Sequence, residues 1–407
     1  MQIEKCKLKS ANRAKAFSDG PGHFQISVSS GLRAWLAIAV GLVSARGAGA
    51  DTVQTSGAML EGTIEVRDCG MLIAGAAVPF SEVLTAVRDG GENTISAAQA
   101  IRMINGEIWC GSILGLETNG LAFRGNLFGE RMIETEGIAT LDFSRRIAPT
   151  AAGKRGMLYR GKGEPIPGSL LWIRESTLAI DCPLGVLPVP RQGVIRYQFK
   201  APLSAVPRKE EDEVGLIDGS VFRGRLSLVS NGLDVAHASL GKVSVPWAAV
   251  RYLLRSSPEL MRLGLPAAGD VETRGPDAPP AAPRFLDYRS GLEPRQPTPV
   301  CLTAVRMLPI TVTRYRLQGR EGRKAWFRAV VVPVPECRGD VRISLQVAGA
   351  TAYARTLPCT NDALTVSIEL PPGEDLTIKT DFDGKLLYPC GVDWQDPCVV
   401  FRREEGR

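Results

Sequence analysis

The sequence predicts an all-β protein, and a degenerate repeat is the first observation behind that prediction. Residues 216–226 echo residues 103–113: in each, an Asp-Gly or Asn-Gly dipeptide is followed five residues later by a glycine inside a strand-like run. Asn-Gly and Asp-Gly supply the positive φ angles that a tight hairpin needs. The second glycine indicates a bulge or a sharp bend in a small curved sheet. A repeat of this kind predicts a modular β architecture.

Alternation of apolar and polar side chains is the second observation. It runs through residues 221–228 and recurs at 341–347 and 364–370, as in half-buried strands. Helical periodicity is confined to residues 81–88 and 97–103. From residue 285 onward, about 120 residues of short strands separated by Pro- and Gly-containing turns predict a β-sandwich of the jelly-roll type.

The repeat spacing and the composition divide the chain into six parts. The distance from the central glycine to the closing apolar residue is 27, 26 and 26 positions in the repeats around Gly111, Gly168 and Gly224. An earlier repeat surrounds Gly62. The predicted parts are a leader with a secretory signal peptide (1–50), β repeats 1 and 2 (51–146), β repeat 3 (153–200), β repeat 4 (213–255), a Pro-rich linker (256–284) and the β-sandwich (285–405).

The leader predicts export. Arg33 precedes an apolar run over residues 34–43, and Ala48-Gly49-Ala50 is typical of a signal-peptidase cleavage site. No later segment is long enough for a transmembrane helix. A periplasmic, cell-surface or extracellular location follows, and with it an environment that permits disulfides.

Cysteine usage fits an oxidising compartment. Removal of the leader takes Cys6 away and leaves eight of the nine cysteines, five of them after residue 300. The favoured pairs are Cys337 with Cys359 and Cys390 with Cys398. Spacing alone does not fix the connectivity, and buried free thiols are the alternative.

The repeats resemble a known small barrel. A bent strand after a Gly turn, a second hairpin and a short closing strand, as in residues 216–226 through 245–250, resemble Sm-like or SH3-like barrels. The same run resembles repeats of exported bacterial proteins of planctomycete type. The resemblance implies several small barrels, and because such barrels have thin cores, neighbouring units are expected to pack on one another.

The C-terminal part resembles carbohydrate-binding modules of the NPCBM type, which have a galactose-binding-like jelly roll. The matching pieces are residues 285–288, 315–317, 341–347 and 391–397, and the Asp393-Trp394 pair is the most characteristic of them. The resemblance implies a non-catalytic domain that binds sugar.

The chain departs from the NPCBM pattern at two places. Residues 307–311 lack the glycines and the histidine of the family's motif, and Cys390 stands where an acidic residue is expected.

Candidate ligand-binding residues are an aromatic platform with polar neighbours, because rings stack on the apolar faces of sugars. We predict Trp394, Asp393, Tyr388 and Asp381 for this role. Clustered carboxylates also suit hard cations, so Asp381, Asp383 and Asp393 form a candidate calcium site.

Enzymatic activity is not expected. His237 is the sole histidine after the leader, which excludes a histidine-rich metal site, and a structural role is expected for it. Paired carboxylates could hydrolyse glycosidic bonds, but Asp381 with Asp383 is more simply a turn, and Asp393 with Asp396 flanks Trp394.

Nucleic acid is a weaker alternative for the partner. Trp247, Phe222 and Arg223 could form a stacking and charged surface. However, the net charge of +6 comes from 37 Arg and 12 Lys residues dispersed along the chain, without the basic run that would favour nucleic acid.

The sequence therefore favours an exported, non-catalytic protein that binds a glycan through its C-terminal domain. A structural scaffold that contacts cell-envelope proteins through its repeats is the alternative, and RNA binding follows behind both.

Overall fold

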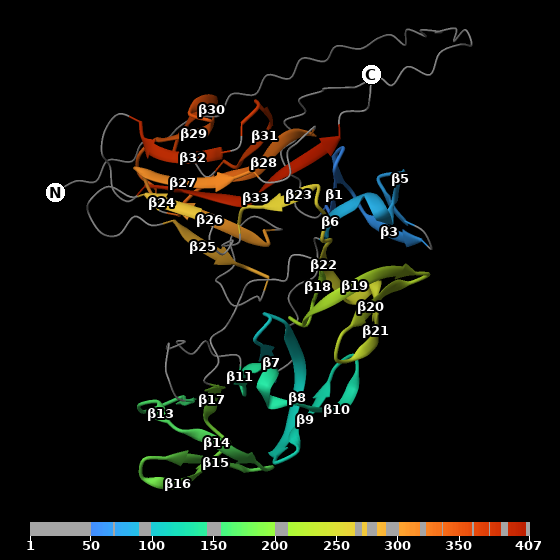
Figure 1. Ribbon diagram of the computed structural model, residues 1–407, viewed down its shortest axis with the longest axis vertical. Helices are drawn as coiled ribbons and strands as arrows, with labels where there is room; N and C mark the ends of the chain where they lie inside the picture. Colours follow the sequence, from blue (N-terminus) through green and yellow to red (C-terminus); the bar gives the residue numbers. More distant parts are fainter. Residues whose placement is uncertain are drawn as a thin grey trace, which may run out of the picture. The chain divides into compact units, whose positions relative to one another are not determined.

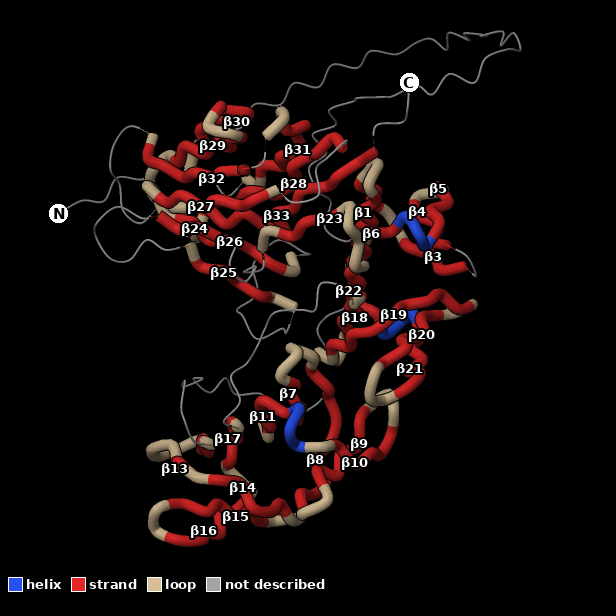
Figure 2. The backbone as a smooth tube through the Cα atoms, in the orientation of Figure 1, coloured by secondary structure: helices blue, strands red, loops and turns tan. Residues whose placement is uncertain are grey.

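The protein is all-β throughout the part of the chain that the structure describes. The computed structural model describes residues 50–67, 70–88, 99–144, 156–199, 211–264, 271–274, 283–289, 301–317, 323–335, 337–359, 362–373, 375–383 and 390–403. Strands dominate these residues, with three short 3-10 turns and no α-helix among them (Figure 2). The predicted leader, Cys6, Cys69 and Tyr388 lie outside the described residues.

None of the described residues forms a helix long and apolar enough to cross a membrane.

Four consecutive units share one strand plan, in which the last strand pairs antiparallel with the first (Figure 1). Unit 1 contains β1 (Thr52–Thr55), β2 (Met59–Glu61), β3 (Ile64–Arg67), β4 (Gly70–Ile73), β5 (Ala76–Pro79), η1 (Phe80–Glu82) and β6 (Val83–Val87). Unit 2 contains β7 (Gln99–Met103), β8 (Ile108–Glu117), β9 (Gly120–Gly125), β10 (Gly129–Ile133), η2 (Thr135–Gly137) and β11 (Ile138–Asp142).

The other two units follow the same order. Unit 3 contains β12 (Met157–Arg160), β13 (Ile166–Pro167), β14 (Ser169–Ile173), β15 (Thr177–Cys182), β16 (Gly185–Pro190) and β17 (Val194–Gln198). Unit 4 contains β18 (Asp212–Leu216), β19 (Val221–Val229), β20 (Gly232–His237), β21 (Gly241–Pro246), η3 (Trp247–Ala249) and β22 (Val250–Leu254).

The repeated glycine is the residue at which the second strand changes partner. β8 pairs with β7 up to Gly111 and with β9 from Gly111 on, and β19 passes from β18 to β20 at Gly224. A Cβ atom would lie 2.1 Å from the Arg124 carbonyl oxygen at Gly111, and 2.4 Å from that of Ala236 at Gly224. Gly168, between β13 and β14, meets β15 in the same way, with its Cβ position 2.5 Å from the Asp181 carbonyl oxygen. The repeated glycine in the sequence therefore marks a place where the backbones of two neighbouring strands come so close that only glycine fits.

The units join edge to edge through their last strands. β6 pairs with β22, and β11 pairs with β17. Buried side chains from all four units form one hydrophobic cluster, from Val53 to Leu253. Joining edges satisfies backbone groups that an isolated unit would expose.

The C-terminal part is a sandwich of two antiparallel sheets, as predicted. The first sheet has the order β25-β26-β33-β28-β31, and β23 also pairs with β33; the second has the order β24-β27-β32-β29-β30. The strands are β23 (Leu260–Arg262), β24 (Val271–Arg274), β25 (Arg284–Asp287), β26 (Thr303–Met307), β27 (Thr311–Arg316), β28 (Arg323–Pro333), β29 (Val341–Val347), β30 (Ala350–Leu357), β31 (Leu364–Leu370), β32 (Asp375–Phe382) and β33 (Val392–Arg403).

The structure corrects the prediction that residues 256–284 form a Pro-rich linker. β23 pairs with β33, and β24 pairs with β27, so this segment adds a strand to each sheet. Its prolines lie outside these two short strands, which is why proline content alone gave the wrong interpretation.

Gly224→Ala tests the role of the partner-changing glycine. We expect it to lower the free energy of unfolding by about 2 kcal/mol or more, because the added methyl group overlaps the Ala236 carbonyl. Gly57→Ala is the control, since the nearest atom to its Cβ position is the Thr55 hydroxyl at 3.6 Å. Urea denaturation of both variants measures the effect; equal midpoints would refute the assignment.

Candidate binding site

Trp394 and Asp393 do not form the exposed site that the sequence suggests. Trp394 is fully buried in the sandwich core, and its ring packs edge-on against Phe327 with centroids 5.8 Å apart. Asp393 is also fully buried and accepts hydrogen bonds from Arg306 Nε at 2.7 Å and Nη2 at 2.8 Å. This burial contradicts the expectation that Trp394 offers a stacking face to a sugar.

The candidate calcium carboxylates do not converge. Asp381 and Asp383 lie exposed at the end of β32, where they accept hydrogen bonds from the Phe382 amide and the Thr356 hydroxyl. Among the described residues, no group of three or more Asp, Glu, His or Cys side chains could hold a metal ion. Asp381, Asp383 and Asp393 therefore do not make a calcium site in this structure.

The favoured disulfides are likewise absent, because Cys337, Cys359, Cys390 and Cys398 are all free thiols. Cys390 instead lies within hydrogen-bonding reach of Cys337. A short turn brings them together: the Val334 amide donates to the Gly391 carbonyl at 3.0 Å, and the Cys337 amide donates to Val334 at 3.1 Å.

A nucleic-acid surface built from Phe222 and Arg223 is also wrong, because both side chains are buried, at 1% and 4% exposure.

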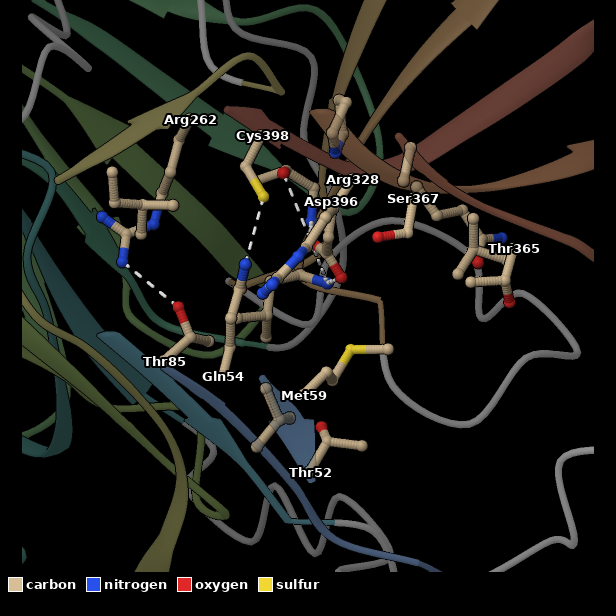
Figure 3. Close-up of a pocket in the computed structure, with 18 of the residues that line it drawn as sticks. Thr52, Gln54, Met59, Thr85, Arg262, Arg328, Thr365, Ser367, Asp396 and Cys398 are labelled. Carbon is tan, nitrogen blue, oxygen red and sulfur yellow. Dashed lines mark hydrogen bonds between the residues drawn. The ribbon is translucent and has the colours of Figure 1, made fainter. Parts of the chain in front are cut away.

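A pocket of about 190 Å³ lies where unit 1 meets the first sheet of the sandwich (Figure 3). Residues of β1, β2, β6 and β22 line one side, and residues of β23, β28, β31 and β33 line the other. The lining combines hydroxyl and amide side chains with aliphatic ones, two arginines, one carboxylate and the Cys398 thiol.

Asp396 lies at a bulge that shapes the pocket. On β33, Asp396 and Pro397 together face a single residue of β28, because Arg328 pairs with Cys398 and Val330 pairs with Gln395. The φ angle of Asp396 is 44°, an unfavourable value for a residue other than glycine. Pro397 has no amide hydrogen to donate, which favours a bulge at this place.

The Asp396 carboxylate is held by the chain before β26. Oδ1 accepts hydrogen bonds from the amides of Thr303 at 2.8 Å and Leu302 at 3.1 Å, and from the Thr303 hydroxyl at 3.3 Å. Burial raises the pKa of Asp396 to about 6, against the opposing effect of these hydrogen bonds and of the Arg262 charge.

Two guanidinium groups face the pocket from different strands. Arg262 donates from Nη2 to the Leu84 carbonyl at 3.2 Å and to the Thr85 hydroxyl at 3.3 Å. Arg328 donates from Nη1 to the Thr55 carbonyl at 3.3 Å. Burial lowers the pKa of both side chains. These bonds fix the cations in place across the boundary between unit 1 and the sandwich.

Cys398 is a structural thiol in this pocket. Its sulfur accepts a hydrogen bond from Gln54 Nε2 at 3.3 Å (Figure 3). Burial raises the pKa of the thiol, which outweighs the lowering effect of Gln54 and of Arg328 and Arg262. A thiol that stays protonated is a poor nucleophile, so the geometry favours binding over covalent chemistry.

Sequence reasoning missed most of this site. It singled out Cys398 as a disulfide partner and Asp396 as a flank of Trp394, and it assigned no role to Gln54, Arg262 or Arg328. The Asp396-Pro397 pair in mid-strand is the one local signal for the bulge. The arginines come from segments that only the fold brings together.

Comparisons with known proteins give no family. No protein-family model matches the chain, and no curated protein matches it. The chain is similar to a solved CBM51 module of Clostridium perfringens GH95 in complex with methyl-galactose, with 8% identity and a TM-score of 0.26, over 35% of this chain and 99% of that one.

Two further solved structures are similar at the same low level. One contains the CBM51-2 and INT domains of Clostridium perfringens ZmpB (11% identity, TM-score 0.25, 47% of this chain and 40% of that one). The other is a CBM36 module in complex with calcium and xylotriose (10% identity, TM-score 0.18, 35% and 98%). These TM-scores are too low to support an assignment, so the geometry of this chain carries the proposals below.

The raised pKa of Asp396 predicts a pH-dependent stability. The folded state holds the proton up to about pH 6, whereas the ordinary pKa is 3.8. Stability from this group is therefore full below about pH 4 and is lost as the pH rises through 6, by at most about 3 kcal/mol. Asp396→Asn should flatten this part of the pH profile of urea midpoints.

The exposed Asp381→Asn variant is the control for Asp396→Asn and should keep the wild-type profile. Parallel profiles for wild type and Asp396→Asn between pH 4 and pH 7 would contradict the prediction.

Oxidation of the folded chain should join Cys337 to Cys390. The two thiols are neighbours, so exchange with oxidised glutathione should link them before any other pair. Peptide mapping under non-reducing conditions detects the link, and Cys337→Ser should leave Cys390 unlinked. A bond between Cys390 and Cys398 as the main product would show that this pairing is wrong.

Proposed function

We propose that this protein is exported and binds carbohydrate without converting it, and that the pocket between unit 1 and the sandwich is its binding site. The observation that supports this proposal most directly is the mixed lining of the pocket. Hydroxyl and amide groups of Thr52, Gln54, Thr85 and Gln395 share it with the aliphatic side chains of Met59, Leu254 and Val366. A sugar ring has the same mixture of apolar C–H faces and polar hydroxyls, and few precisely placed polar groups suffice to orient it.

The size of the pocket supports a single ring. An apolar cavity of about 150 Å³ holds benzene, so a volume of about 190 Å³ is suited to one six-membered ring with its substituents. None of the described residues that line this pocket is aromatic. Aliphatic contacts would therefore replace the stacking that the sequence suggested for Trp394.

A non-catalytic role is supported by the titratable groups of the pocket. Glycoside hydrolysis generally needs two carboxyl groups that flank the bond, and Asp396 is the single carboxylate that the described residues contribute to the lining. Its Oδ1 is already occupied by backbone amides.

The alternative role is a scaffold for cell-envelope proteins. One observation favours it: the β15–β16 hairpin of unit 3 exposes apolar side chains at Leu184 (97%), Val186 (61%) and Leu187 (40%). Exposed apolar clusters of this kind mark contact surfaces.

A bulky residue in the pocket tests the first proposal. Ser367→Trp places an indole in the pocket from the exposed edge of β31, and we expect it to weaken glycan binding at least tenfold because the ring occupies the ligand volume. Ala354→Trp is the matched control, since Ala354 is also exposed on an edge strand, β30, but does not line the pocket.

Glycan-array screening identifies a ligand, and calorimetry then compares the two variants with wild type. A folded wild-type protein that binds no glycan would refute the proposal. Equal affinity of wild type and Ser367→Trp would refute the location of the site.

A further inference from the structure

The charges around the pocket do not balance. Arg262 and Arg328 face it, and among the described lining residues Asp396 is the one carboxylate, which leaves one positive charge in excess. Within the described residues, neither arginine has a carboxylate oxygen within ion-pair distance. Their hydrogen bonds go to carbonyl and hydroxyl oxygens instead.

This excess of positive charge has a free-energy cost. Both arginines are partly buried, and a partly buried cation loses some of its hydration, which neutral acceptors only partly replace. The lowered pKa of both guanidinium groups has the same cause, which is burial. An anion between the two arginines would offset this unfavourable excess of positive charge. The two guanidinium groups are already held in place by their hydrogen bonds to Leu84, Thr85 and Thr55.

Arg328 has donors to spare for such an anion. In the described structure its guanidinium makes one hydrogen bond, which Nη1 donates. The N–H groups of Nε and Nη2 therefore donate to none of the described residues. In Figure 3 its guanidinium lies inside the pocket near Asp396. The planar fork of a guanidinium binds an oxyanion with two parallel hydrogen bonds, which a hydroxyl group does not match.

We propose that the ligand is an acidic sugar, a ring that carries one singly charged oxyanion such as a carboxylate or a sulfate ester, and that Arg328 and Arg262 bind this group. The proposal rests on the carbohydrate-binding function above and adds the charge of the substituent. One negative charge balances the excess of one positive charge, whereas a phosphate ester carries between one and two and would leave the pocket negative.

The pH dependence gives the proposal a second signature. Asp396, with its pKa of about 6, is ionised at pH 7 and protonated at pH 5, so the excess positive charge of the pocket doubles on acidification. Within the part of the chain that the structure describes, the other charged or titratable groups that face Asp396 are Arg262, Arg328, Cys301 and Cys398. Burial raises the pKa of both thiols, which stay neutral in this range. Affinity for an acidic sugar should therefore rise as the pH falls from 7 to 5.

Calorimetry with the full chain tests the proposal. The probes are glucuronate, galacturonate, glucose 6-sulfate, glucose and galactose. We expect at least one acidic probe to bind tenfold or more tightly than its neutral counterpart. Raising the salt concentration from 50 to 500 mM should weaken only the acidic probes. The carboxylate and sulfate arms show which oxyanion the arginines prefer.

Arg328→Gln should reduce the ratio of acidic to neutral affinity toward one, and Arg328→Lys should restore part of it. Arg355→Gln, an exposed arginine of β30 outside the pocket lining, is the control and should keep the ratio. If Arg328→Gln does not fold, the salt and pH series on the wild-type protein decide the matter.

The outcomes separate the two proposals. If neutral sugars bind as tightly as acidic ones, the acidic-sugar proposal is overturned and the carbohydrate-binding function stands. If no probe and no arrayed glycan binds, the function itself is overturned. An acidic preference that survives in both Arg328→Gln and Arg262→Gln would show that other groups bind the anion.

Discussion

The junction between the repeat units and the sandwich depends on one buried carboxylate, that of Glu213 in β18. It accepts hydrogen bonds from Arg223 at 2.8 Å, from the Tyr252 hydroxyl at 2.9 Å and from Arg289, which follows β25, at 3.0 Å. Burial opposes the charge, but Arg289 and Arg223 outweigh it and hold the pKa of Glu213 below its usual value. Loss of either arginine would remove one of the two charges that compensate for the burial of Glu213, at a cost of up to about 3–5 kcal/mol. This charged cluster joins unit 4 to the sandwich.

The pocket also depends on contacts between distant segments, because its two sides belong to different parts of the chain. Bonds from Arg328 to the Thr55 carbonyl, from Arg402 to the Ser56 carbonyl and from Gln54 to the Cys398 sulfur cross from unit 1 to the sandwich. An isolated sandwich would keep the arginines of β23 and β28 but would lose the groups that orient them. The proposed ligand binding would thus be a property of the assembled chain and not of the sandwich alone.

How much the sequence predicts depends on how local the physical cause is. The glycine repeat predicts the unit plan, because the constraint at Gly111 or Gly224 is a crossing of neighbouring strands within one unit. The exposure of Trp394 could not be predicted, since alternation along β33 marks two faces without saying which is covered, and the partner of Asp393 is Arg306, 87 positions earlier. The pocket joins residues near 54 with residues near 398, and no local pattern encodes that meeting.

Buried acids at the other unit boundaries, like Glu213, bind side chains of a neighbouring unit. Asp142 of unit 2 accepts hydrogen bonds from Arg102 at 2.6 Å and from Arg196 of unit 3 at 2.5 Å. Glu107 of unit 2 contacts His237 Nε2 of unit 4 at 2.9 Å, while His237 Nδ1 accepts the amides of Ser239 and Leu240. Because Nδ1 accepts hydrogen bonds, the ring proton lies on Nε2 and is donated to Glu107. Both ring nitrogens are therefore used in structural contacts. Because buried ion pairs add little net stability compared with apolar contacts, we infer that these acids select which unit edges join.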